Sequence, residues 1–155
     1  MDYSAPLQDA KWSPAADLPV ATVNVDGVIT PGEQAVISVF DHGFLYGDGV
    51  YETLRTYNRQ PFLLGPHLAR LRASAERLTL KIPLTDEAFD TRVRETIADG
   101  HVDGDVTIRI LVTRGVGELS YDPLVCPTPT VVIIVRAHRE MPPSIWRDGV
   151  HVVVA

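Results

Sequence analysis

The sequence predicts an α+β fold, in which strands from separate parts of the chain flank two consecutive helices. Residues 20–30 alternate around Asp26-Gly27, which is a two-residue hairpin signal. Residues 66–99 carry apolar side chains at helical spacing, and the strongest strand-like segments, Val106–Thr113 and Thr130–Ala137, come after them. A chain of 155 residues fits one domain with a buried core.

The part of the chain before the helices is expected to form strands joined by tight turns. Residues 50–57 alternate apolar and polar side chains, as a half-buried strand does, and they follow a glycine-rich turn at 41–49. Two more strands are expected on either side of this pair, at residues 35–40 and 61–64.

Two helices are expected next. The first begins near Pro66, because proline suits the first helical position. Four apolar residues then recur at spacings of three and four and form one buried stripe: Leu68, Leu71, Ala75 and Leu78. The second helix begins after Thr85, which can cap it, and ends at about Asp99.

The chain divides into four expected parts: a loose arm at 1–18, an α+β domain at 19–137, a linker at 138–149 and a strand starting at 150–155. Pro142-Pro143 favours the linker. An apolar strand at the last residue leaves an unpaired edge, so we expect the chain to be the N-terminal part of a longer protein.

Composition excludes several classes of function. The net charge of −6 argues against a general nucleic-acid or acidic-membrane surface. Cys126 is the only cysteine, so no internal disulfide forms and a cytoplasmic setting is expected. No signal peptide or membrane span is expected, since residues 1–19 lack an apolar stretch and the longest apolar run is short. The histidines show no metal-ligand spacing, so no metal site is expected.

Arg70 is the first candidate for a functional residue. In the first turn of the expected helix it would oppose the helix dipole unless an anion lay nearby. A guanidinium with free helix N–H groups can hold a phosphate. The simpler alternative is a solvated surface arginine, and His67 beside it could be structural.

Polar side chains on two expected strands are further candidates. Tyr51, Thr53 and Arg55 share one face by the period of two, which fits either a ligand site or a solvent-facing sheet. Arg109 stands among apolar residues and needs an anionic partner. Glu52, Asp48 or a substrate carboxylate could be that partner.

Glycine-rich and nucleophile motifs are not met. The segment 43–49 lacks the Gly-Lys-Ser/Thr of a phosphate-binding loop, and Glu52 replaces the third glycine of a dinucleotide-binding motif. There is also no Gly-x-Ser-x-Gly elbow.

Taken in order, these segments resemble the class IV (fold type IV) aminotransferases, which use pyridoxal 5'-phosphate. The resemblance covers nearly the whole chain and rests on five matches: Asp26-Gly27, Asp41-His42-Gly43 through Tyr51-Glu52, Tyr57-Asn58, His67-Leu68-Ala69-Arg70-Leu71 and Thr113-Arg114-Gly115. It implies the family's small N-terminal domain, an antiparallel sheet with two helices, then the linker and the start of a large domain.

The resemblance also implies roles for individual residues. Arg70 matches the arginine that binds the cofactor phosphate, and Tyr46 and Tyr51 match aromatic positions of the substrate pocket. Arg55 and Arg109 match positions near the substrate carboxylate in branched-chain enzymes. The loop after Arg114 resembles one that reaches the partner's site in a homodimer.

Two departures bear on substrate class. Thr107 stands where branched-chain enzymes usually have a tyrosine that contacts the substrate carboxylate. The Arg-x-His pair of D-amino acid enzymes is absent from residues 115–122.

The catalytic lysine is a third departure. Only Lys11 and Lys81 are lysines among the 14 basic residues, and neither matches the family's Schiff-base lysine, which is expected beyond Ala155. We therefore expect a branched-chain-like aminotransferase whose first 155 residues are inactive by themselves. The alternatives are an aminodeoxychorismate lyase, a D-amino acid aminotransferase, or a non-catalytic domain that dimerises or binds a partner.

Overall fold

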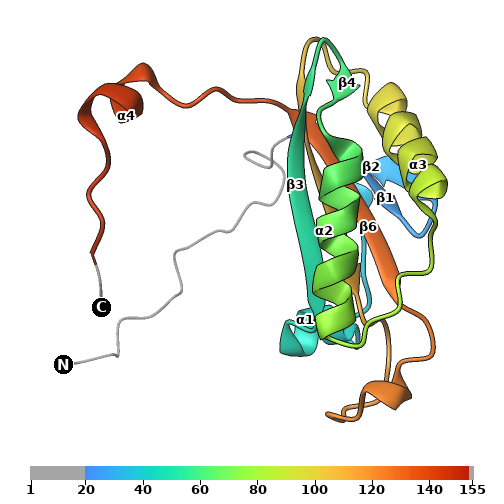
Figure 1. Cartoon of the computed structure of the whole chain (residues 1–155). Helices are drawn as coiled ribbons and strands as arrows, with labels where there is room; N and C mark the ends of the chain where they lie inside the picture. The colour runs from blue at the N-terminus through green and yellow to red at the C-terminus, as the bar shows by residue number, and fades with distance from the viewer. Residues whose placement is uncertain (1–19, 154–155) are drawn as a thin grey trace, which may run out of the picture.

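A computed structural model describes residues 20–153 of the chain (Figure 1). The arm expected at 1–18 and the last two residues of the expected final strand lie outside the described part. The strands are β1 (Ala21–Val25), β2 (Val28–Pro31), β3 (Gly49–Tyr57), β4 (Gln60–Pro61), β5 (Val106–Thr113) and β6 (Thr130–Ala137). The α-helices are α1 (His42–Tyr46), α2 (Leu64–Arg77), α3 (Asp86–Asp99) and α4 (Pro143–Asp148).

The strands form one six-stranded sheet in the order β2-β1-β6-β5-β3-β4. All of its pairings are antiparallel, which confirms the α+β prediction. The Asp26-Gly27 hairpin, β5 and β6 form where the sequence predicted them. On its outer side β3 pairs with β4 only at Thr56 and Tyr57, so most of this strand keeps a free edge.

Helices α2 and α3 lie side by side over one face of the sheet (Figure 1). Helix α2 packs on β3, while α3 packs on β1 and β6. The stripe predicted on α2 supplies Leu68, Leu71 and Ala75 to the core, and α3 supplies Phe89 and Val93. Each large apolar side chain among them stabilises the fold by roughly 1.5–3 kcal/mol through burial. Thr85 caps α3 as predicted, by accepting a hydrogen bond from the Ala88 amide.

The strand predicted at residues 35–40 is wrong. This segment follows a short 3-10 turn (Gly32–Gln34) and forms no ladder, because β2 already ends that side of the sheet. Its apolar side chains Val36, Val39 and Phe40 are exposed. The predicted glycine-rich turn also contains the short helix α1, whose first amide groups are capped by Asp41.

Boundaries near α2 differ from the prediction as well. The helix begins at Leu64, so Pro66 is its third residue, where the missing N–H still costs no helical hydrogen bond. The return strand is only Gln60–Pro61.

The segment after β6 contains one short helix and extends away from the sheet (Figure 1). Helix α4 lies within the stretch predicted as a linker. Residues 150–153 form no strand, since no strand edge of the described chain is there to pair with them. The division into domains stays a prediction. Within residues 20–153 no helix is long and apolar enough to cross a membrane.

Candidate functional site

The strand register gives the sheet two chemically different faces. One face packs under α2 and α3, and we call it the helix face: Glu52 and Leu54 of β3, Ile108 and Ile110 of β5, and Ile133 of β6. The opposite face, which we call the open face, carries Tyr51, Thr53 and Arg55 of β3, Thr107, Arg109 and Leu111 of β5, and Val132, Ile134 and Arg136 of β6.

The open face brings the predicted strand residues together. Tyr51 lies opposite Leu111, Thr53 opposite Arg109, and Arg55 opposite Thr107. Directly opposed side chains of an antiparallel pair lie about 4.5–5.5 Å apart at Cβ. Residues separated by more than fifty positions in the sequence therefore form one polar surface.

Arg109 is held in this surface by two neighbours. Its Nε donates a hydrogen bond to Thr53 Oγ1 at 3.2 Å, and its guanidinium lies 4.9 Å from the centre of the Tyr51 ring. The acids that the sequence offered as partners are engaged elsewhere, Glu52 with Arg70 and Asp48 with Arg114. Within residues 20–153, Arg109 has no carboxylate partner.

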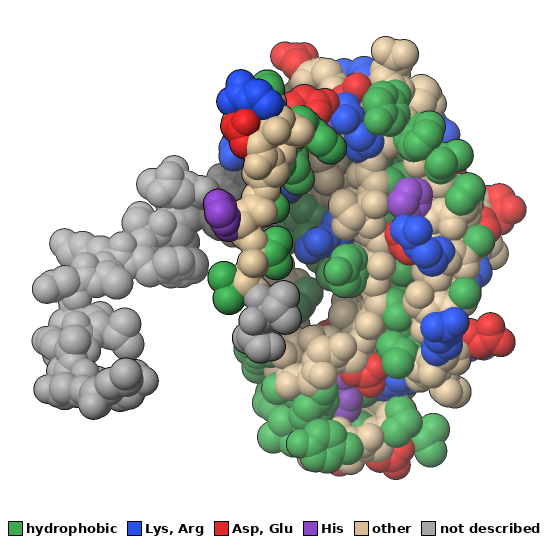
Figure 2. Space-filling model, turned by 60° about the vertical axis from the view of Figure 1, so that its left-hand side comes forward, with side chains coloured by type: hydrophobic (Ala, Val, Ile, Leu, Met, Phe, Trp, Pro, Cys, Tyr) green, Lys and Arg blue, Asp and Glu red, His purple; other side chains and the backbone are tan. Residues whose placement is uncertain are grey.

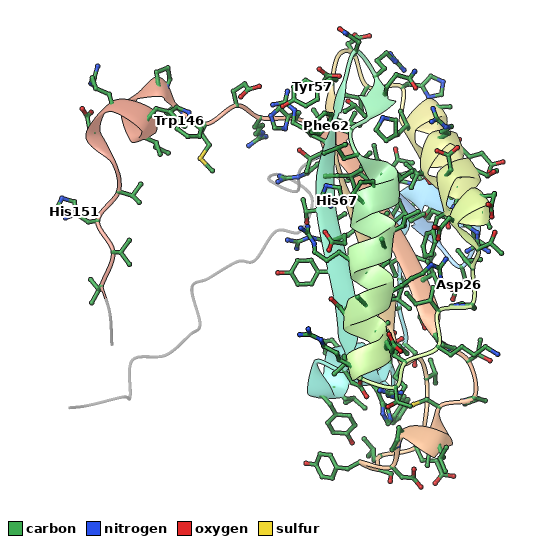
Figure 3. The ribbon with its side chains drawn as sticks, in the orientation of Figure 1. Asp26, Tyr57, Phe62, His67, Trp146 and His151 are labelled. Carbon is green, nitrogen blue, oxygen red and sulfur yellow. The ribbon has the colours of Figure 1, made fainter. Side chains whose placement is uncertain are left out.

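Arg70 belongs to a three-residue cluster with Glu52 and His67. Its Nε and Nη2 donate to the two Glu52 carboxylate oxygens, each at 2.6 Å. His67 Nδ1 lies 2.9 Å from the same carboxylate, and it is the donor because an ionised carboxylate only accepts. His67 lies on the side of α2 that faces β3 (Figure 3). The cluster thus fixes α2 to the free edge of β3.

The charges of this cluster support one another. The hydrogen bond from Arg70 lowers the pKa of Glu52 below its ordinary value, although burial opposes the shift, and the His67 contact lowers the pKa further. The same hydrogen bond raises the pKa of Arg70. Glu52 is therefore a buried carboxylate that stays ionised at neutral pH.

The reason given from sequence for a phosphate near Arg70 is wrong. Because α2 begins at Leu64, Arg70 lies in the second turn, and its position involves neither the helix dipole nor free helix N–H groups. The guanidinium still has donors to spare. Its side chain is 66% exposed, and within the described chain its Nη1 donates no hydrogen bond. A phosphate at the edge of β3 could accept from this group.

Tyr46 lies apart from the open-face residues, at the end of α1. Its ring packs edge-on against His42 at 4.9 Å and lies 5.1 Å from the Tyr121 ring, both measured between ring centres. Gly47 follows in the left-handed conformation, with φ of 68°, and lets the chain turn from α1 into β3. The structure thus joins Tyr46 to the loop after Arg114.

Arg55 and Thr107 are both engaged with residues that follow β6. Arg55 Nη1 donates to Glu140 Oε1 at 3.0 Å, and its guanidinium lies 4.4 Å from the Tyr57 ring centre. The Thr107 hydroxyl lies 2.9 Å from His138 Nδ1. His138 and Glu140 were missed from sequence, because no local pattern links them to β3 or β5.

The loop after Arg114 is anchored at its start. Arg114 Nη2 donates to Asp48 Oδ1 at 3.1 Å and to the Leu78 carbonyl at 2.8 Å. The Gly115 carbonyl accepts from the His42 amide at 2.9 Å. These contacts bind the beginning of the loop to α1 and to the end of α2.

Lys81 is the one lysine of the described chain, and it is exposed in the loop after α2. It lines a pocket with Arg114 and Cys126, separate from the pocket that Arg109 lines. The predicted Lys11 lies outside the described residues. No group of three or more His, Cys, Asp or Glu side chains in the described part could hold a metal ion.

Comparison with known proteins gives consistent results. The family described as "Amino-transferase class IV" matches residues 49–154. A protein of Methanocaldococcus jannaschii, assigned by name to the branched-chain-amino-acid aminotransferases, is 41% identical over 84% of this chain and 44% of its own length. The aminodeoxychorismate lyase of Bacillus subtilis is 31% identical over 82% of this chain and 44% of its own length.

A solved structure extends the likeness to three dimensions. The branched-chain amino acid aminotransferase of T.th., in complex with N-(5'-phosphopyridoxyl)-L-glutamate, has a TM-score of 0.70 and 26% identity. The match covers 79% of this chain and 42% of that chain. The chain therefore spans less than half the length of the proteins that it matches.

Proposed function

The chain belongs to the amino-transferase class IV family, and from that membership we propose that the whole protein transfers an amino group between an amino acid and a 2-oxo acid with pyridoxal 5'-phosphate. One observation carries this proposal. Both sides of β3 present cationic groups at the same free edge: Arg70, held by Glu52, and Arg109, which has no carboxylate partner in residues 20–153. A ligand with a phosphate and a carboxylate would match that edge.

The residues of this chain would bind and orient. Arg70 donates to the cofactor phosphate through its spare N–H groups, while Glu52 and His67 fix the direction of its guanidinium. Arg109, steadied by Thr53 and the Tyr51 ring, binds a substrate carboxylate. Tyr51 excludes water beside it. The bound cofactor supplies the electron sink for the reaction at the substrate amine.

Residues 20–153 supply no group to exchange the proton during the reaction. Lys81 lines another pocket, and the guanidinium of an arginine stays protonated. We propose that the lysine comes from outside this chain, so that the 155 residues by themselves bind ligands without turnover.

Cofactor binding by the chain tests the role of Arg70. Pyridoxal phosphate is titrated into the chain and followed by its absorbance and by quenching of protein fluorescence. Loss of a charge-assisted hydrogen bond should weaken binding by about 10- to 100-fold in Arg70→Met. Arg77→Met, at the exposed end of the same helix, is the matched control. Equal affinities for the two variants would contradict the proposal.

Elimination by a lyase is the second candidate, which the Bacillus subtilis relative favours. Product analysis of the whole protein separates the two reactions. A transaminase forms a 2-oxo acid only when an amino acceptor is present, whereas a lyase releases pyruvate from aminodeoxychorismate without one. Absence of both activities would favour a non-catalytic binding domain.

We also propose that the protein is a homodimer. Large apolar side chains are exposed where α1 meets the loop after Arg114, including Phe44, Leu119, Tyr121 and Leu124. Hydrophobic side chains gather at this end of the molecule (Figure 2), and such patches mark protein interfaces. Sedimentation equilibrium tests the proposal, and a monomer at every concentration would contradict it.

A further inference from the structure

Arg136 is a second arginine on the open face, beside Arg109. In the β5–β6 ladder Arg109 lies opposite Ile134, and Thr107 lies opposite Arg136. The two arginines are therefore diagonal neighbours on adjacent strands and point to the same side. Diagonal neighbours lie about 7–8 Å apart, within reach of long side chains.

The two guanidinium-bearing side chains line one pocket. Its volume is about 240 Å³, and its lining residues are Thr53, Thr107, Arg109, Ile134 and Arg136. Figure 2 shows a hollow on this side of the molecule with a basic side chain at its wall. Two hydroxyl groups and two guanidinium groups around one pocket are donors suited to an anion.

No carboxylate lines this pocket, although the whole chain has a net charge of −6. The acids around it are committed to other groups: Glu52 to Arg70 and His67, and Glu140 to Arg55 and, at 3.4 Å, to His138. Within residues 20–153 Arg136 forms no ion pair. Two like charges held near each other are unfavourable, and an anion between them removes that cost.

We infer that Arg136 is a specificity-determining residue, which together with Arg109 binds the carboxylate at the far end of a dicarboxylic amino or 2-oxo acid. In identifying the ligand as a substrate, this inference rests on the proposed function. Each guanidinium can hold one carboxylate oxygen or fork across two. A branched apolar side chain would leave both cations desolvated and unpaired, so the pocket favours an acidic substrate over an apolar one.

Binding of simple carboxylates to the chain tests this inference without any cofactor. Glutarate is the dicarboxylic probe and isovalerate the branched apolar probe, each titrated at constant ionic strength and followed by calorimetry or by amide NMR shifts. Glutarate should bind at least about 10-fold more tightly than isovalerate. Since the cofactor is absent, this result is independent of whether the chain binds pyridoxal phosphate.

Variants then assign the binding to Arg136. Arg136→Met should weaken glutarate binding about 10-fold or more and leave isovalerate unchanged, the loss expected when one charge-assisted hydrogen bond is removed. Arg136→Lys, which keeps the charge but lacks the fork, should lie between them. Arg139→Met, an exposed arginine beyond the strand, is the matched control.

Three results would overturn the inference: no glutarate binding, equal affinity for the two probes, or unchanged glutarate binding by Arg136→Met. Thermal unfolding of each variant shows whether it is folded. If Arg136→Met does not fold, Arg136→Gln takes its place with the same expected loss. A chain that binds glutarate through Arg136 but fails to bind pyridoxal phosphate would sustain this anion site and reject the proposed function.

Discussion

Replacing Glu52 with glutamine should remove the charge that holds Arg70 against β3. The carboxylate accepts two hydrogen bonds of 2.6 Å from Arg70 and one of 2.9 Å from His67, and its side chain is only 7% exposed. Glutamine keeps the shape but places an amide donor against the donors of Arg70 or His67. The variant therefore exchanges an attraction for an unfavourable contact inside the protein.

The expected size follows from these contacts. A hydrogen bond to a charged group contributes about 1.5–3 kcal/mol. Because the guanidinium side of the contact is exposed to solvent, we expect the lower part of this range, about 2 kcal/mol, for Glu52→Gln. For a chain of this length that corresponds to a Tm lower by roughly 4–8 °C. Glu95→Gln, an exposed glutamate on α3, should shift the Tm by little and is the control.

The dependence on pH gives a sharper test. Arg70 lowers the pKa of Glu52, so the ionised form stabilises the fold at every pH above the ordinary glutamate value of about 4.3. This contribution is lost only as the pH falls through the lower pKa of the folded state. Urea unfolding should therefore separate wild type from Glu52→Gln at pH 7, and the difference should shrink in stronger acid. A difference that is absent at pH 7, or that is constant down to strong acid, would refute the ion-pair argument.

Two further predictions concern the fold around the site. Phe89→Ala removes a fully buried ring between α3 and the sheet, and urea unfolding should show a loss of about 3–5 kcal/mol, whereas a loss under about 1 kcal/mol would mean that the core is not packed as described. Gly115→Ala should cost about 2 kcal/mol or more, because φ is +96° and the new Cβ would overlap the Thr128 carbonyl oxygen. The matched control is Gly65→Ala in α2, where a Cβ meets nothing within 4 Å, and it should be neutral or stabilising; equal effects of the two alanines would contradict the described backbone.

Local patterns were sufficient for most secondary structure. The β5 and β6 strands, the Asp26-Gly27 turn and the cap at Thr85 depend on residues close in sequence, and they were predicted at the right places. The strand expected at residues 35–40 failed because apolar composition shows only a tendency to pair. Whether an edge is there to receive the strand depends on the rest of the sheet.

The candidate site shows the same division. Alternation with a period of two placed Tyr51, Thr53 and Arg55 on one face, and the same rule would have placed Arg136 on a face of its strand. It could not show that Arg136 lies across from Thr107, because register between strands depends on the pairing of distant segments.

The sequence by itself thus determined the order of strands and helices, the residues that share a face, and the resemblance to a family. The tertiary structure decided which charges meet. Glu52 pairs with Arg70 across 18 residues, and Arg55 with Glu140 across 85. Ion pairs act over a few ångströms in space and are indifferent to separation along the chain, so only the folded sheet could show that these acids are taken while Arg109 and Arg136 face a pocket without one.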